Sequence, residues 1–225
     1  MYDINNFKNT ISDGFSFYGI KPVDNAISDY VKYFELLIDW NQRTNLVSKN
    51  DLPRFAEYHI LDSLKVCSFI NFFNIKRILD FGSGAGLPGV PIAIAFPQIE
   101  IFLVDSRKKR CIFLNEIKKN FSYLNINVIH SKAESMPENF NGFFDIVITR
   151  AVYDFKTFYL VSKRFLNDNG ALVSIKGDNI KNELSDIENI IDNDVFNIKI
   201  YVPAQFKNVR QGNIAVISKI SFQQF

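Results

Sequence analysis

The chain has 225 residues, 47% of them hydrophobic, so it can bury one substantial core. Its formal net charge of +2 does not by itself indicate nucleic-acid binding, and two cysteines without a Cys-x-x-Cys pair, beside two histidines, argue against a structural zinc site. The start of the chain lacks the pattern of a signal peptide and the longest apolar run, 87–96, is short and interrupted by prolines, so we expect a soluble cytoplasmic protein without a membrane span.

The N-terminal part is predicted to be helical. Apolar residues recur every three or four positions over 24–40, and a second helical stretch covers 55–69. We interpret residues 1–72 as an N-terminal helical cap. No Gly/Ser-rich linker separates it from the main domain, 73–225, so the cap is expected to pack on that domain.

From residue 75 onward, predicted strands and helices alternate. The expected strands cover 76–81, 99–105, 126–130, 144–149, 170–176, 196–202 and 213–220, and the expected helices cover 88–96, 107–120, 133–137, 154–166 and 180–192. This order predicts an α/β fold with a parallel sheet and helices on both faces. The last two strands leave no room for a helix between them, so the final strand is expected to be antiparallel.

A glycine-rich turn follows the first of these strands. Glycine tolerates positive φ and has no Cβ, so the backbone of this turn can approach a bound molecule closely. The turn contains Asp80-x-Gly82-x-Gly84-x-Gly86, the acid-plus-three-glycines pattern of S-adenosylmethionine-dependent methyltransferases. The overlapping frame from Gly84 to Gly89 matches the dinucleotide pattern G-x-G-x-x-G, which leaves an NAD-dependent enzyme as a more remote alternative. The seven-stranded sheet with a reversed last strand favours the class I, Rossmann-like methyltransferase fold.

Two further strand ends offer donor-binding residues. Asp105 ends the second strand, 19 residues after Gly86, where a carboxylate can accept both hydroxyls of a ribose. The alternative role of Asp105 is to cap the helix that begins at 107. Ala133 and Glu134 follow the third strand, beside the expected position of an adenine ring, and the alternative for Glu134 is to stabilise a helix dipole.

The fourth and fifth strands end in cations. Arg150 is expected near the methyl donor and acceptor, where it would hold the donor carboxylate or a substrate phosphate; the alternative is an internal ion pair with a strand-end acid. Lys176 closes the fifth strand on the same rim, and we take both as candidate catalytic residues. The fourth strand lacks the Asn/Asp-Pro-Pro-aromatic turn of enzymes that methylate exocyclic amino groups.

The charge is unevenly distributed, with six cations against two acids over 105–119. In a helix over 107–120, Lys108 and Lys119 point away from the apolar face and are candidate RNA-binding residues. Solvated helix faces account for the same charges equally well.

Taken together, these elements resemble the bacterial 16S ribosomal RNA guanine-N7 methyltransferase family, the glucose-inhibited division protein B family. The matching segments are Trp40-Asn41, Asn45-Leu46, His59 to Leu64 with Asp62-Ser63, Leu79 to Gly89, Asp105 to Lys109, Ala133-Glu134, Thr149 to Ala151 and Lys176-Gly177. The resemblance implies donor contacts at Gly82, Leu87, Ala133, Glu134 and Arg150, with Asp105 near the ribose. Family members carry an Arg-His pair before the final strand, where this chain has Arg210-Gln211-Gly212-Asn213.

The resemblance implies S-adenosylmethionine as cofactor and small-subunit rRNA, or the ribosomal particle, as partner. We also expect a monomeric protein without a metal. Guanine N7 carries a lone pair and no proton, so direct displacement on the methyl group needs no base. We expect His59 to fix the cap against the sheet rather than to act as a base. The alternative function is a small-molecule methyltransferase, with the cap as a lid over its pocket.

Overall fold

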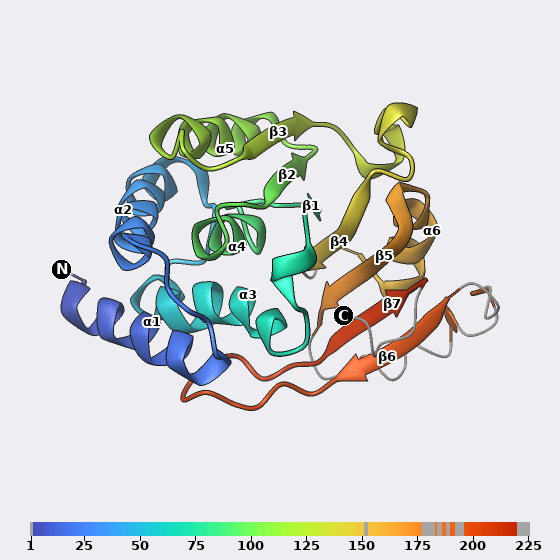
Figure 1. Cartoon of the computed structure of the whole chain (residues 1–225). Coiled ribbons are helices and arrows are strands. Elements are labelled where there is room, and N and C mark those ends of the chain that lie inside the picture. Colours follow the sequence, from blue (N-terminus) through green and yellow to red (C-terminus); the bar gives the residue numbers. More distant parts are fainter. Residues whose placement is uncertain are drawn as a thin grey trace.

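Seven strands of the described chain form one sheet. The computed structural model describes residues 2–150, 153–176, 183, 186–187, 190–191 and 196–219. The strand order is β3-β2-β1-β4-β5-β7-β6, and β7 runs antiparallel to both of its neighbours, as predicted (Figure 1). The strands are β1 (Arg77–Phe81), β2 (Glu100–Asp105), β3 (Ile126–His130), β4 (Phe144–Arg150), β5 (Leu166–Ile175), β6 (Asn197–Tyr201) and β7 (Ile214–Ser218).

Alternating side chains of the strands form two separate cores. In β1, Ile78 packs with the N-terminal helices, whereas Leu79 and Phe81 belong to the cluster on the opposite face. The first face is covered by α1 (Ile4–Tyr18), α2 (Ala26–Thr44), α4 (Gly89–Ala95) and α5 (Lys108–Asn120), and α6 (Phe155–Ser162) lies on the other (Figure 1). The residues of the predicted cap therefore share one continuous core with the sheet.

Two tyrosines of α2 connect the helical N-terminal part to the segment after β1. Tyr30 Oη donates to the carbonyl of Pro91 at 2.7 Å, and Tyr33 Oη donates to the carbonyl of Ala85 at 2.6 Å. Both rings are fully buried. The glycine turn is thus supported from behind by α2.

The helical stretch predicted over 55–69 is not one regular helix. It consists of a π-helical turn η2 (Ala56–Leu61), the short α3 (Asp62–Leu64) and a 3₁₀ turn η3 (Lys65–Ser68), preceded by η1 (Leu52–Arg54). Side chains compete for its carbonyls, since Ser63 Oγ donates to the carbonyl of His59 and Arg150 Nη1 donates to that of Tyr58. Such competition disturbs the regular ladder of an α-helix.

Three more predictions need correction or fall outside the structure. The helix predicted over 154–166 ends at Ser162 and is followed by the 3₁₀ turn η7 (Lys163–Phe165). The helix cannot continue to 166, because β5 already starts at Leu166, which pairs with Phe144 of β4. The short helix expected over 133–137 is only the 3₁₀ turn η5 (Ala133–Ser135). Pro137 disfavours helical geometry at the residue before it, Met136. The helix expected over 180–192 falls mostly outside the described residues.

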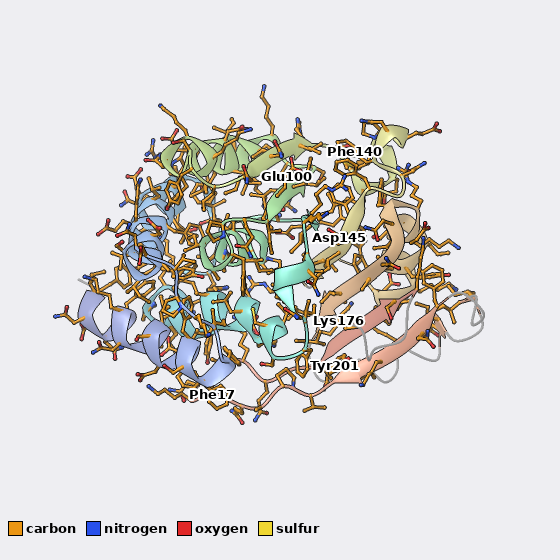
Figure 2. All side chains as sticks on the ribbon, viewed as in Figure 1. Phe17, Glu100, Phe140, Asp145, Lys176 and Tyr201 are labelled. Carbon is orange, nitrogen blue, oxygen red and sulfur yellow. The ribbon has the colours of Figure 1, made fainter. Side chains whose placement is uncertain are left out.

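The segment between β6 and β7, residues 202–213, packs against the N-terminal part. Phe206 contacts Phe17 of α1, with ring centroids 5.1 Å apart; Figure 2 labels Phe17 near the end of that helix. Lys207 forms an ion pair with Asp13 of α1. Segments from both ends of the chain therefore meet at one edge of the molecule.

Candidate active site

The turn after β1 depends on its glycines. Gly82, Gly84 and Gly86 have φ values of 70°, 57° and 89°, a region that favours glycine. A Cβ on Gly86 would lie 2.5 Å from Val90 Cγ2, so that position also has no space for a side chain. The N–H groups of Gly82 and Ser83 both donate to the carbonyl of Val104 in β2. The turn is thereby held against the end of β2.

Asp105, at the end of β2, is 3% exposed and connects three parts of this site. Its Oδ2 accepts from the Gly84 N–H at 3.0 Å and lies 3.2 Å from Arg110 Nη1, and its Oδ1 accepts from the Arg107 N–H at 2.8 Å. The carboxylate braces both the glycine turn and the start of α5. Asp105 thus accepts from the N–H of Arg107, the residue before α5, and it also lines the neighbouring cavity, where ribose binding stays a prediction.

A cavity of about 360 Å³ opens at the ends of β1, β2 and β3, within the range of about 300–1,000 Å³ usual for small-molecule sites. Of the predicted donor-binding residues, Gly82, Asp105, Ala133 and Glu134 line it. The other lining residues are Phe81, Val104, Ser106, Arg107, Arg110, Ser131, Lys132 and Tyr153. Ala133 is buried and Glu134 is exposed. A buried carboxylate, a small apolar side chain and a bare backbone turn suit a ribose, an adenine ring and a methionine chain.

Four predicted donor-binding residues do not line this cavity: Gly84, Gly86, Leu87 and Arg150. Gly84 meets it through its bond to Asp105, Gly86 packs on Val90, and Leu87 is 4% exposed within the core. The Leu87 N–H donates to the carbonyl of Ser83 at 2.8 Å. Gly86 and Leu87 therefore shape the turn, and direct contact with a donor stays a prediction for them.

Arg150, at the end of β4, is held by residues of the helical N-terminal part. Its Nη1 lies 3.3 Å from Asp62 Oδ2, and its Nη2 lies 3.1 Å from His59 Nδ1. Asp62 Oδ1 in turn accepts from Lys65 Nζ at 2.7 Å. The internal ion pair that the sequence analysis considered therefore exists, but its acid comes from α3 and not from a strand end. The Arg150 side chain keeps 17% exposure, so contact with a ligand stays a prediction.

His59 is a neutral link between cap and sheet. Burial, with the positive charges of Arg150 and Arg210, lowers the pKa of His59 to about 3. Its Nδ1 accepts from Arg150, which places the proton on Nε2, 3.4 Å from Asp51 Oδ2 without the alignment of a hydrogen bond. The expected fixing role of His59 agrees with these contacts.

Lys176, the other candidate catalytic residue, has its charge neutralised locally. Its Nζ donates to the carbonyl of Tyr153 and lies 2.8 Å from Glu183 Oε2, while its N–H donates to Asn213 before β7. Figure 2 shows Lys176 close to the end of β5. Because Tyr153 lines the cavity, Lys176 supports its wall, and a catalytic role stays a prediction.

The two lysines predicted to bind RNA are exposed on α5. Phe113, Leu114 and Ile117 form the buried face of that helix, as predicted, and Lys108 and Lys119 lie outside it. RNA binding by these two lysines stays a prediction.

Sequence reasoning missed two residues of the site. Arg110 contacts Asp105, and both side chains line the cavity. The sequence pointed to Arg110 only by placing it five residues after Asp105 in a basic run. Asp62 lies in the segment from His59 to Leu64 that resembles the family, but no local pattern assigns it a partner, because its contact with Arg150 joins residues far apart in sequence.

Within the described residues, no helix is long and apolar enough to cross a membrane. The same residues contain no group of three or more His, Cys, Asp or Glu side chains that could hold a metal ion.

The comparisons with known proteins agree with this geometry. A family model named GidB, described as rRNA small subunit methyltransferase G, matches residues 26–205. A protein of that description from Francisella tularensis subsp. novicida is 31% identical over 214 residues, covering 95% of this chain and 98% of the relative. Another, from Lysinibacillus sphaericus, is 32% identical over 170 residues, 75% of this chain and 71% of the relative.

Solved structures share the fold. An rRNA methylase from Streptococcus thermophilus matches with a TM-score of 0.52 and 14% identity, covering 72% of this chain and 95% of that one. A branched-chain polyamine synthase from Thermus thermophilus, in complex with N4-aminopropylspermidine and 5'-methylthioadenosine, matches with a TM-score of 0.57 and 13% identity, covering 83% and 63%. At these identities the likeness concerns the fold alone.

Proposed function

Because this chain belongs to the GidB family, whose members are described as rRNA small subunit methyltransferase G, we propose that it methylates N7 of a guanine in 16S rRNA. The methyl donor is S-adenosylmethionine, and the sheet is that of a class I methyltransferase. The protein acts as a monomer in the cytoplasm, on the rRNA or the small-subunit particle.

The observation that carries this proposal is the cavity beside the glycine turn, with the buried Asp105 in its wall. In this proposal Asp105 receives the ribose hydroxyls, the turn at Gly82 faces the methionine chain, and Ala133 with Glu134 flanks the adenine. When bound, the donor supplies an electrophilic methyl group. For a ribose to use Asp105 Oδ2, Arg110 has to share or leave that oxygen, which already accepts from the Gly84 N–H.

The residues of this chain act by positioning. Guanine N7 has an available lone pair, so the reaction needs alignment of nucleophile and methyl group rather than removal of a proton. His59, which contacts Arg150, has its Nδ1 occupied by that arginine and a pKa lowered to about 3 by burial and nearby cations. The Lys176 ammonium is engaged by Glu183. Arg150, fixed by Asp62, is the cation that would hold the donor carboxylate or a substrate phosphate.

The test is transfer of labelled methyl groups from S-adenosylmethionine into small-subunit particles, free 16S rRNA and a metabolite extract. We expect label in the rRNA, released by nuclease digestion as 7-methylguanosine, with Arg150→Ala strongly impaired and still folded. The single-turnover rate should stay nearly flat from about pH 6 to about pH 9, where a general base would titrate. Label in metabolites instead of rRNA would overturn the proposal in favour of a small-molecule methyltransferase.

A further inference from the structure

The ring of Tyr58, in η2, has two arginines over it: Arg54, four residues earlier, and Arg210, from the distant segment between β6 and β7. The guanidinium carbon of Arg54 lies 4.1 Å from the ring centroid, and that of Arg210 lies 5.0 Å from it. Among the described residues, no other aromatic ring carries two cations. We call these three side chains the Tyr58 cluster.

The Tyr58 cluster adjoins the reactive edge of the sheet. The carbonyl of Tyr58 accepts from Arg150 Nη1 at 3.4 Å, and the next residue, His59, contacts Arg150 Nη2. Arg210 comes from the segment between β6 and β7 and lies 2.7 Å from Asp51 Oδ2. The segment around Tyr58 and the segment between β6 and β7 therefore meet next to Arg150, the arginine at the end of β4.

Both arginines of the cluster have unused donors. Arg54 is exposed and donates to Tyr58 Oη, and Arg210, with 45% of its side chain exposed, donates to Asp51. Among the described residues each gives this single side-chain hydrogen bond, whereas a guanidinium carries five N–H groups. An exposed cation–π contact adds little to the stability of a fold, so stability does not explain why two arginines gather here.

An aromatic ring with two planar guanidinium groups beside it matches what single-stranded RNA offers. Unpaired bases stack on tyrosine rings and on arginine planes, and phosphate oxygens accept paired hydrogen bonds from arginine. We infer that the Tyr58 cluster is the docking surface for an unpaired segment of the rRNA substrate, with a base stacked on the cluster and a neighbouring phosphate bound by its arginines. This inference rests on the proposed function and adds to it the surface that presents the substrate to the site.

The experiment compares Tyr58→Ala, Tyr58→Phe and Arg54→Ala with Arg43→Ala as the matched control. Arg43 is likewise stacked over an aromatic ring, Trp40 at 5.7 Å, and paired with an acid, Asp39. Binding to 16S rRNA is measured by filter retention over a range of salt concentrations, and donor affinity by calorimetry.

We expect Tyr58→Ala to weaken rRNA binding about tenfold or more, through lost base stacking, with donor affinity unchanged. Tyr58→Phe, which keeps the ring, should stay within about threefold of wild type. Arg54→Ala should weaken binding and lower the slope of log affinity against log salt by about one, as the loss of one phosphate contact predicts. Arg43→Ala should behave as wild type.

If Tyr58→Ala and Arg54→Ala bind rRNA with the affinity and salt slope of the wild type, the inference is overturned. The proposed function still stands in that case, provided that the wild type methylates rRNA. If Tyr58→Ala does not fold, the exposed Arg54→Ala decides. An equal loss of affinity in Arg43→Ala would also overturn it, because the effect would then be one of general charge. A wild-type protein that neither binds nor methylates rRNA would remove the proposed function and the inference together.

Discussion

Replacing Asp80 by asparagine should make the stability of the protein less dependent on pH. Asp80, in β1, is fully buried; its Oδ2 accepts from the Gly89 N–H at 2.9 Å, and its Oδ1 is buried without a hydrogen-bond partner. Burial raises the pKa of Asp80 from 3.8 to about 7, although the Gly89 N–H and other neighbours oppose the change. The folded state therefore binds this proton more tightly than the unfolded state does.

The sign and size of the effect follow from this difference. The stabilisation that the protonated carboxyl provides is fully present below pH 3.8 and is lost as the pH rises to about 7. At about 1.4 kcal/mol per pH unit, the interval from 3.8 to about 7 corresponds to an order of 4 kcal/mol. Asparagine does not titrate and can still accept from the Gly89 N–H, so Asp80→Asn should gain in free energy of unfolding, relative to wild type, across this interval.

Urea unfolding of both proteins at several values between about pH 4.5 and about pH 8 measures this difference. We expect the free energy of unfolding of Asp80→Asn minus that of wild type to increase steadily with pH and to level off above about 7. Asp168→Asn, at an exposed carboxylate in β5, is the control and should show no such trend. A difference that stays constant over the whole range would refute the reasoning, because it would mean that Asp80 titrates alike in both states.

Three other changes test the site. Asp105→Ala should weaken S-adenosylmethionine binding by about 1–3 kcal/mol in calorimetry, because the carboxylate faces the cavity, and unchanged affinity would argue against a ribose contact. Replacing Lys108 and Lys119 by Glu should lower the salt slope of rRNA binding by about two, and an unchanged slope would mean that these charges only solvate α5. Asp62→Asn should lower the free energy of unfolding by about 3 kcal/mol or more, measured in urea, because it leaves the buried Lys65 and the half-buried Arg150 with a neutral partner; a near-neutral effect would contradict this.

Periodic patterns predicted the sheet and the donor-binding side of the site. The glycine turn follows β1, and Asp105 is the last residue of β2; both strands are mostly apolar. The ends of parallel strands meet at one edge of the sheet, so the two features were expected to lie together. The missing helix between the last two strands was enough to predict the antiparallel β7.

The surroundings of Arg150 could not be predicted in this way. Its partners His59 and Asp62 lie 91 and 88 residues away in the chain, and no local pattern encodes such a pairing. The irregular turns over 56–68 have the same origin, since the carbonyl of Tyr58 is used by that distant guanidinium. The spacing of apolar residues predicts a regular helix there, because it carries no information on such tertiary contacts.

The contacts of the segment between β6 and β7 have a consequence for the order of folding. Lys207 meets Asp13 across 194 residues, and Arg210 meets Asp51 across 159. Closing such long loops costs chain entropy before the contacts at their ends can form. We therefore expect these pairs to form after the sheet has assembled. The side of the sheet with the cavity, from β1 to β3, consists of neighbouring segments and can form from a nascent chain. The Tyr58 cluster requires Arg210, so a ribosome must synthesise the chain beyond that residue before the surface proposed to recognise rRNA exists.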